Sequence, residues 1–530
     1  MSIFGEKNDM MKKSWTVLFL ALLLGIAGCT KPPVTPEESG SGSESGTTAP
    51  DSGLDEQTKN IYRYARTFAV GRMNLYYLWQ AEIEKDLKAW KETEEPIEKV
   101  YDIRYKNAQG KDVDRWSMMT DDFSSFYNSV SGTEETAGFD FVFYYLDSSH
   151  TSLCAVVNFV YPDSPAAKAG LKRGDVIEKV NGAAIPYPSY TNAYYTLMGG
   201  EKFTVSLYDS KQTDSKQTLT IDPVEMYLDP VLITKVFDCG SKKVGYLHYT
   251  SFTLDSCEEL ISACKAFKEE GISELIVDLR YNGGGFAITE QVIASMLAPE
   301  KVVANQEVLS TEIFNSKLTQ YYKQNNYDTN TYFSTDYDLS TGGKSYVFTT
   351  SGANLNLDKL YFIISSGTAS ASEALIGDLV PYMDVVLLGG QTHGKYCSGL
   401  MLSAEDYWEE NANQLGGSFT ANAKKYTDNW GLYLMYSRFA DKNGETLCMP
   451  DGIVPDQEVD DDPLDGYQLG DPEETMLKET LKLCGYKQKA PAALRGIRRD
   501  FQPEKAPTAP DELRPDYGLR IVLPERAGLH

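Results

Sequence analysis

The sequence predicts an α/β fold for the larger part of the chain. Three stretches, which begin at Val244, Leu275 and Leu360, each start with a short apolar run rich in β-branched or aromatic residues. A helical pattern or a glycine-rich turn follows each run. Strands that alternate with helices in this way are typical of a sheet covered by helices. We therefore expect a layered α/β core over residues 227–486, with separate regions before and after it.

Length and composition allow several domains. The chain has 530 residues, of which 42% are hydrophobic, and a formal net charge of −26. That length and apolar content suffice for two to four domains with real cores. Because phosphates require a basic surface, the strong negative charge argues against nucleic acid as a partner.

The first residues have the features of a targeting segment. Lys12 and Lys13 precede the apolar run Val17–Ile26, which is too short to span a bilayer comfortably, and Ala27-Gly28-Cys29 follow it. Small residues before a cysteine resemble the bacterial lipobox. We therefore expect residues 1–28 to be a lipoprotein signal peptide, with Cys29 lipidated after cleavage. The alternative is an ordinary signal peptide with an incidental cysteine.

This resemblance implies a place in the cell. A lipidated Cys29 would anchor the protein to a membrane of the bacterial cell envelope. Thr30, in place of an aspartate, resembles lipoproteins that are sent on to the outer membrane, where the protein would face the periplasm or the cell surface. Residues 29–53 are rich in Pro, Gly, Ser, Thr and Glu, and therefore predict a flexible linker from the lipid.

Residues 54–132 predict a helical lead-in. Apolar residues recur at helical intervals between Leu54 and Trp90, and Asp121-Asp122 begin a further short helix. The aromatic residues in this region are more typical of a core than of a ligand site.

Residues 133–226 form a separate module in this interpretation. Alternating apolar residues predict strands over Phe139–Tyr145 and Leu153–Tyr161, and Asn181-Gly182 predicts a hairpin turn. The pattern from Pro165 to Ile177 resembles a PDZ domain of the bacterial protease type. The module thus either precedes the α/β core or is inserted into it.

The PDZ resemblance implies a peptide-binding groove. Gly138, Phe139, Asp140 and Phe141 would form its carboxylate-binding loop, and a helix over Tyr190–Met198 would form its wall. Such a groove binds the free C-terminus of a protein by adding the peptide as a strand. The partners would then be protein or peptide substrates with free C-termini. The alternative is a spacer or gate that binds no ligand.

Three strands of the expected core each deliver one chemical group. Ser370 lies where the strand over Leu360–Ile364 gives way to a helix, and a serine there is either a helix cap or a nucleophile. Lys395 follows a second strand. The glycines Gly283, Gly284 and Gly285 follow a third, and their backbone N–H groups are unencumbered. A hydroxyl, an amine and free N–H groups are the parts that acyl transfer needs.

These motifs resemble the carboxy-terminal processing peptidases, or tail-specific proteases, which are serine peptidases with a Ser-Lys dyad. The resemblance covers Thr368 to Glu373, Thr392 to Lys395 and Asp278 to Gly285, and a closing segment near Pro455. It implies a crotonase-like ββα core with Ser370 as the nucleophile and Lys395, 25 residues later, as the base. The backbone N–H groups of Gly283, Gly284 and Ala371 would form the oxyanion hole.

Two features depart from the family pattern. Tyr281 and Gly283 stand where the family usually has Asn and Pro. Gly399 stands four residues after Lys395, where many members carry a Gln that orients the amine. Which residue orients Lys395 is left open. These departures are compatible with an alternative function: the protein would be a catalytically impaired family member that acts as a peptide-binding lipoprotein.

The proposed base must lose its charge. An unperturbed lysine titrates near ~10.4, and lowering its pKa to about 7 or 8 requires about 3 to 5 kcal/mol, which burial can supply. We therefore expect Lys395 to be dry. A Ser-His-Asp triad that uses His248 or His393 is the rival arrangement. The eight cysteines show no metal-ligand spacing, so no cofactor and no metal are expected.

Residues 487–530 form a Pro-rich tail with clustered arginines. This composition predicts disorder. The alternative is that the tail folds back on the protein.

Overall fold

A computed structural model describes residues 53–208, 217–341, 344–487, 504–506 and 519–523. The signal peptide, Cys29 and all but the last residue of the expected linker lie outside these residues, so their roles stay predictions. None of the described helices combines the length and the apolar character needed to cross a membrane.

The region expected to be helical contains four helices before the PDZ module. α1 begins after Asp55, whose side chain accepts a hydrogen bond from the Thr58 N–H and so caps the helix. α1 also packs against two later helices, α12 and α14. The N-terminal helices are α1 (Glu56–Tyr76), α2 (Gln80–Ala89), α3 (Pro96–Ile103) and α4 (Phe123–Val130), and the later helices of this region are α12 (Ala404–Glu410), α13 (Ala412–Leu415) and α14 (Gly417–Thr427).

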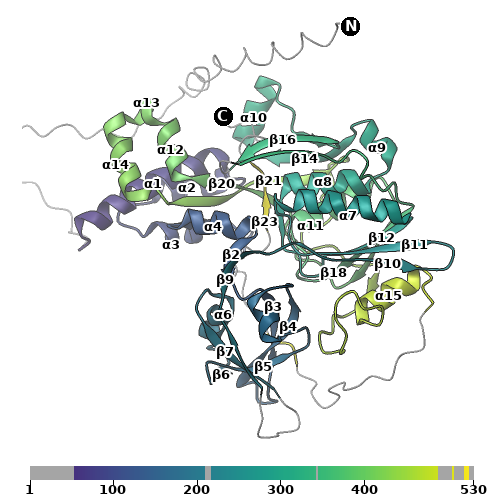
Figure 1. Cartoon of the computed structure of the whole chain (residues 1–530). Helices are drawn as coiled ribbons and strands as arrows, with labels where there is room; N and C mark the ends of the chain where they lie inside the picture. The colour runs from purple at the N-terminus through teal and green to yellow at the C-terminus, as the bar shows by residue number, and fades with distance from the viewer. Residues whose placement is uncertain (1–52, 209–216, 342–343, 488–503, 507–518, 524–530) are drawn as a thin grey trace, which may run out of the picture. The chain divides into compact units, whose positions relative to one another are not determined.

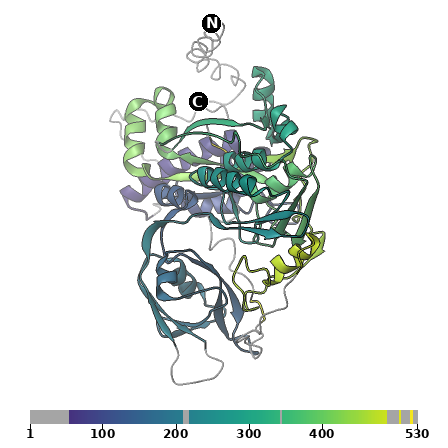
Figure 2. The same cartoon turned by 45° about the vertical axis from the view of Figure 1, so that its right-hand side comes forward.

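The PDZ module has its own sheet and its own hydrophobic core. Figure 2 shows this sheet curving around a helix. The strands, in spatial order, are β3 (Phe139–Tyr145), β4 (Ser152–Val160), β6 (Ala183–Pro186), β5 (Val176–Val180), β7 (Phe203–Leu207) and β8 (Thr218–Ile221). Its helices are α5 (Pro165–Ala169) and α6 (Thr191–Met198).

One two-stranded ribbon carries both ends of this module. β2 (Thr133–Thr136) enters it and β9 (Val224–Tyr227) leaves it, and the two strands pair antiparallel along their whole length.

The core contains a mainly parallel sheet of six strands. Its buried strands are nearly all apolar, as expected for strands covered on both faces. In order they are β10 (Val231–Asp238), β11 (Lys243–Tyr249), β12 (Glu274–Asp278), β18 (Lys359–Ile364), β19 (Val385–Gly389) and β22 (Gln457–Glu458). The alternation of strands and helices predicted from the sequence is present, with α7 (Ser256–Glu270), α11 (Ala371–Leu379) and α15 (Thr475–Leu483) between or after the strands.

A second core sheet contains a strand from the tail. It runs β13 (Gly284–Phe286), β23 (Leu519–Ile521), β20 (Cys397–Ser403), β21 (Gly431–Asp441), β14 (Val308–Phe314) and β15 (Asn330–Tyr332), and β1 (Met118–Thr120) also pairs with β21. β23 is the yellow arrow near β21 in Figure 1. The remaining elements are α8 (Ala287–Leu297), α9 (Glu300–Ala304), α10 (Ser316–Asn325) and the hairpin of β16 (Asp336–Thr341) and β17 (Lys344–Thr349).

The described parts of the tail differ from the disorder expected for residues 487–530. Residues 504–506 pair with β3 of the PDZ module, and residues 519–521 form β23. The physical reason is strand addition, because backbone groups of the tail bond the edges of existing strands. Composition does not reveal such an edge.

Candidate active site

Ser370 occupies the turn between β18 and α11. Its backbone has φ +61° and ψ −109°, a conformation that non-glycine residues rarely adopt. The residue is fully buried, and its Oγ has no hydrogen-bond partner within the described residues. A strained strand-to-helix turn that presents an uncommitted hydroxyl is typical of a nucleophile.

Lys395 lies in the loop between β19 and β20 and is fully buried, as expected. Its Nζ is 2.9 Å from the hydroxyl oxygen of Tyr433. The amine also lies 4.9 Å from the centre of the Tyr433 ring and 5.5 Å from that of the Trp116 ring. The Lys395 amine is therefore enclosed by aromatic side chains and out of contact with bulk solvent.

The carboxylate of Glu373 joins the two candidate residues. Its Oε2 accepts hydrogen bonds from the backbone N–H of Ser370, at 2.8 Å, and from that of Lys395, at 2.9 Å. Its Oε1 accepts from the Gly394 N–H at 2.7 Å and from the Thr392 hydroxyl at 2.5 Å. One side chain therefore holds the Ser370 turn and the Lys395 loop together.

Burial affects Glu373 as well. Desolvation raises its pKa to about 7, although the four hydrogen bonds act in the opposite direction. Glu373 is not among the site residues predicted from the sequence. The Ser-x-x-Glu spacing from Ser370 to Glu373 is the pattern of a helix capping box and could have revealed it.

The glycine run lies against the Ser370 turn. A Cβ added to Gly284, whose φ is +105°, would be 3.0 Å from both the Ala369 carbonyl oxygen and the Ala371 nitrogen. The structure thus brings Gly284 and Ala371 together, with Gly283 next in the chain. The Gly284 N–H, however, donates to Oδ1 of Asn282 at 2.8 Å. It would have to leave this acceptor in order to bind an oxyanion.

Tyr433 is a second site residue that the sequence does not predict. It lies on β21, and a Cβ at Gly399 would be 2.3 Å from its ring. The Tyr433 ring therefore takes the space beside position 399, and its hydroxyl reaches the Lys395 amine. Burial raises the pKa of Tyr433 above its ordinary value, so the phenol is neutral.

His248, the rival base, belongs to a different cluster. Its Nδ1 is 3.3 Å from Oδ2 of Asp278, and its ring packs against Phe159 and Tyr281. Asp278 also pairs with the buried Arg280 at 2.7 Å. These contacts give His248 a role in the core below the glycine run.

Tyr281 connects this cluster to the PDZ module. Arg173 of that module donates to the Tyr281 hydroxyl at 2.7 Å and pairs with Asp461 at 2.8 Å. Tyr281 in turn donates to Asp461, and Arg280 pairs with Glu474 at 2.7 Å. The departure at position 281 thus supplies a hydroxyl that links the PDZ module to the strand end before the glycines.

The residues expected to form the carboxylate-binding loop lie at the start of β3. Gly138 turns the chain with φ +74°, and Phe139, Asp140 and Phe141 are strand residues with a register shift after Asp140. Phe141 packs against Tyr194 of α6, with ring centres 5.9 Å apart. Phe141 of β3 and Tyr194 of α6 thus lie next to each other on the side of the module where the groove is expected.

The described residues contain neither a metal-ligand cluster nor an exposed thiol. No group of three or more His, Cys, Asp or Glu side chains in this part could hold a metal ion. The described cysteines are free and buried, and burial raises the pKa of the Cys397 thiol well above its ordinary value.

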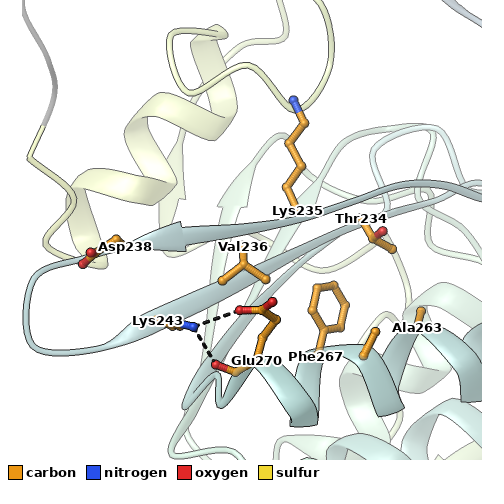
Figure 3. Close-up of a pocket in the computed structure, with 9 residues that line it drawn as sticks. Thr234, Lys235, Val236, Asp238, Lys243, Ala263, Phe267 and Glu270 are labelled. Carbon is orange, nitrogen blue, oxygen red and sulfur yellow. Dashed lines mark hydrogen bonds and ion pairs between the residues drawn. The ribbon is translucent and has the colours of Figure 1, made fainter.

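One hollow in the described part of the chain is lined by residues other than Ser370 and Lys395. It measures about 480 Å³ and lies between β10, β11 and α7. In Figure 3, Lys243 pairs with Glu270 at its rim, and Lys235 points away from that pair. The exposed lysine and glutamate satisfy each other.

Two protein-family models and several curated proteins are similar to parts of this chain. Residues 243–459 match the model of peptidase family S41, and residues 156–207 match a PDZ domain model. A carboxyl-terminal-processing protease of Synechocystis is 27% identical over 44% of this chain and 47% of its own length. The carboxy-terminal processing protease CtpB of Bacillus subtilis is 25% identical over 60% of this chain and 61% of its own.

A solved structure supports the fold. The crystal structure of an S41-type protein from Bacteroides fragilis covers 82% of this chain and 99% of its own, with 22% identity and a TM-score of 0.56. The predicted fold class, an α/β peptidase core with a PDZ domain and an N-terminal helical segment, is confirmed. The chain spans about half the length of the first two curated relatives, at 47% and 49%.

Proposed function

Because residues 243–459 belong to peptidase family S41, we propose that the chain is a serine endopeptidase with Ser370 as the nucleophile and Lys395 as the general base. One observation carries this proposal. The backbone N–H groups of both residues bind the same carboxylate oxygen of Glu373, which ties the alcohol-bearing turn to the amine-bearing loop.

In the proposed reaction Lys395 is neutral and accepts the proton of the Ser370 hydroxyl as Oγ attacks a peptide carbonyl. The Lys395 amine donates one N–H to Tyr433, which orients its lone pair. The developing oxyanion would be received by backbone N–H groups of Ala371 and the glycine run. The protonated amine then returns the proton to the leaving nitrogen, and water hydrolyses the acyl enzyme.

Substrates would be recognised by their C-termini. The groove between β3 and α6 would add the substrate tail as a strand, and the N–H groups near Gly138 to Phe141 would bind its carboxylate. Lipidation at Cys29 would hold the enzyme at a membrane of the bacterial envelope, the outer membrane in organisms that have one. Loss of labelled fatty acid incorporation on Cys29→Ala would test the anchor.

The function is tested with an unfolded protein that ends in an apolar carboxyl terminus. Ser370→Ala and Lys395→Ala should each lower its cleavage at least about 10³-fold. Ser262→Ala is the control, because Ser262 is exposed on α7 and its hydroxyl donates only within that helix, to the Glu258 carbonyl at 2.8 Å. Full activity in Lys395→Ala would show the dyad to be wrong.

A second function is a binding protein that captures peptide tails without cleaving them. The engagement of the Gly284 N–H by Asn282 favours it, since that N–H does not face a substrate. Binding of the peptide tail without any Ser370-dependent cleavage would identify this function.

A further inference from the structure

The tail strand β23 lies among the residues of the candidate active site. It is inserted between β13, which begins at Gly284, and β20, which follows the Lys395 loop. A Cβ on Gly284 would be 2.2 Å from the carbonyl oxygen of Leu519. The Tyr433 hydroxyl donates to the Arg520 carbonyl at 3.4 Å, and the Val522 N–H donates to the Gly399 carbonyl at 3.0 Å.

These contacts involve the backbone of the tail. Backbone contacts read an extended peptide whatever its sequence. The groove beside Ser370 and Lys395 therefore accommodates an extended chain, and the protein's own residues Leu519–Leu523 occupy it.

The side chain of Arg520 enters a separate, acidic pocket, where only 2% of the residue remains exposed. Its guanidinium pairs with Glu312 and, at 3.1 Å, with Glu290. It also bonds Ser398 Oγ at 2.5 Å and lies 4.9 Å from the centre of the Phe439 ring. Carboxylates and an aromatic face together are a binding site for a guanidinium or an ammonium.

The pocket is built on fixed elements of the core. Glu312 lies on β14 and accepts hydrogen bonds from Ser398 of β20, at 3.1 Å, and from Ser437 of β21, at 2.5 Å. Glu290 lies on α8 and is almost fully buried. The Glu312 carboxylate is thus held in place by residues other than Arg520.

A cation is needed to balance this pocket. Without one, the buried carboxylates would face each other with no opposite charge, which is strongly unfavourable. Burial and the neighbouring Glu290 raise the pKa of Asp378, which lies beside them, well above its ordinary value. An apolar or acidic side chain would leave Glu290 and Glu312 without the positive charge that Arg520 supplies, and should therefore bind more weakly.

The same tail also reaches the PDZ module. The Tyr145 N–H donates to the Glu504 carbonyl at 2.8 Å, and the Ala506 N–H donates to the Phe143 carbonyl at 3.0 Å. Ala506 is buried in the PDZ hydrophobic core. The tail thus adds a strand to the edge of β3 opposite β4, where the expected groove would take a peptide, and a second strand in the peptidase domain.

We propose that the pocket formed by Glu290, Glu312 and Ser398 selects an arginine or lysine of an extended peptide bound in the peptidase groove, and that the tail residues Leu519–Leu523 are its resident ligand. The proposal deepens the peptidase function proposed above and rests on it. It predicts substrates with a basic residue beside the cleaved bond, and a tail that competes with them.

The test measures binding apart from cleavage. The full chain with Ser370→Ala and Arg520→Ala is titrated with three labelled peptides that copy residues 517–523, with Arg, Ala or Glu at the position of Arg520. The Arg peptide should bind at least about tenfold tighter than the other two. It should also bind at least about tenfold tighter to this variant than to the Ser370→Ala chain, whose tail still competes.

A pocket variant provides the second measurement. Adding Glu312→Gln should weaken binding of the Arg peptide, whereas Glu409→Gln, an exposed acid paired with Lys424 at 2.6 Å, should not. Thermal unfolding checks that each variant is folded. If Arg520→Ala or Glu312→Gln unfolds the chain, the ranking of the three peptides on the Ser370→Ala chain decides instead.

Equal binding of the three peptides would overturn the proposal. The peptidase function is judged separately, by adding the Arg peptide to the Arg520→Ala chain with Ser370 intact. Selective binding without cleavage would leave the pocket standing and contradict the peptidase. Cleavage without preference for Arg would support the peptidase function and contradict the proposed pocket.

Discussion

The ring of Tyr433 and the backbone of Gly399 lie so close that no side chain fits between them. A Cβ at position 399 would be 2.3 Å from Cε2 of Tyr433, whose hydroxyl is 2.9 Å from the Lys395 amine. The family resemblance implies a Gln at this position that orients the lysine, and Gly399 has no side chain to do so. Here we infer that Tyr433 is the positioning residue.

Tyr433→Phe should therefore lower kcat/KM about 10- to 100-fold, because the amine loses the acceptor that orients it. The pH profile of kcat/KM should shift as well, since the neighbour of the titrating amine has changed. Gly399→Ala should give a similar loss through the collision with the ring. Tyr407→Phe, in a buried aromatic cluster elsewhere, is the control. An unchanged pH profile in Tyr433→Phe would restrict Tyr433 to a structural role.

Glu373 predicts an unusual pH dependence of stability. Its pKa is about 7 in the folded chain, against an ordinary value of 4.5, because burial disfavours the carboxylate. Between these values the folded state holds a proton that the unfolded state lacks. The contribution of Glu373 to the free energy of unfolding is thus present below pH ~4.5 and is lost as the pH rises through 7, at up to ~1.4 kcal/mol per pH unit.

Urea unfolding of the unsubstituted chain and of Glu373→Gln at pH 5 to 8 measures this contribution. The stability of the unsubstituted chain relative to the variant should fall as the pH rises and then level off. Glu405→Gln, an exposed acid on α12, should give a curve parallel to that of the unsubstituted chain. A parallel curve for Glu373→Gln would show that Glu373 does not titrate in this range.

Gly284 cannot carry a side chain without blocking the groove. With φ at +105° and the Leu519 carbonyl oxygen 2.2 Å from an added Cβ, Gly284→Ala should cost about 1–3 kcal/mol in unfolding free energy. It should also lower kcat/KM about 100-fold by displacing the bound peptide. Gly417→Ala has open space around its Cβ and serves as the control. Full activity in Gly284→Ala would place the substrate elsewhere.

The link between the PDZ module and the core depends on Arg173. Its guanidinium is buried against Asp461 and Glu474, so Arg173→Ala leaves buried charges with less compensation. We expect a loss of about 3–5 kcal/mol in the free energy of unfolding, measured in urea. The neighbouring Lys172, whose side chain is 67% exposed, should cost less than ~0.5 kcal/mol when changed to Ala. Equal effects of the two changes would mean that the buried pairs contribute nothing net.

Local patterns predicted the strands, the helices and the position of Ser370 at a turn, because these follow from periodicity and capping within a few residues. They also placed Lys395 in a loop at a strand end. Tyr433 was missed because an aromatic residue within a continuous apolar strand looks like core, and its proximity to Lys395 arises only when β20 and β21 pair.

The tail shows a second limit. Its prolines and arginines predict disorder, since they cannot form a core of their own. Arg520 is nevertheless buried, because acids on α8 and β14, far away in the sequence, form a pocket for it. The composition of a segment indicates whether it can fold alone, but not whether a distant part of the chain forms a binding site that orders it.

The ribbon of β2 and β9 has a consequence for how such enzymes diversify. Paired strands lie about 4.8 Å apart, so the two points where the chain enters and leaves the PDZ module are close enough for a two-residue turn to join them. Residues 137–223 are in this sense a cassette. Recombination or engineering could exchange this cassette for another peptide reader with adjacent termini and leave the peptidase chain unbroken.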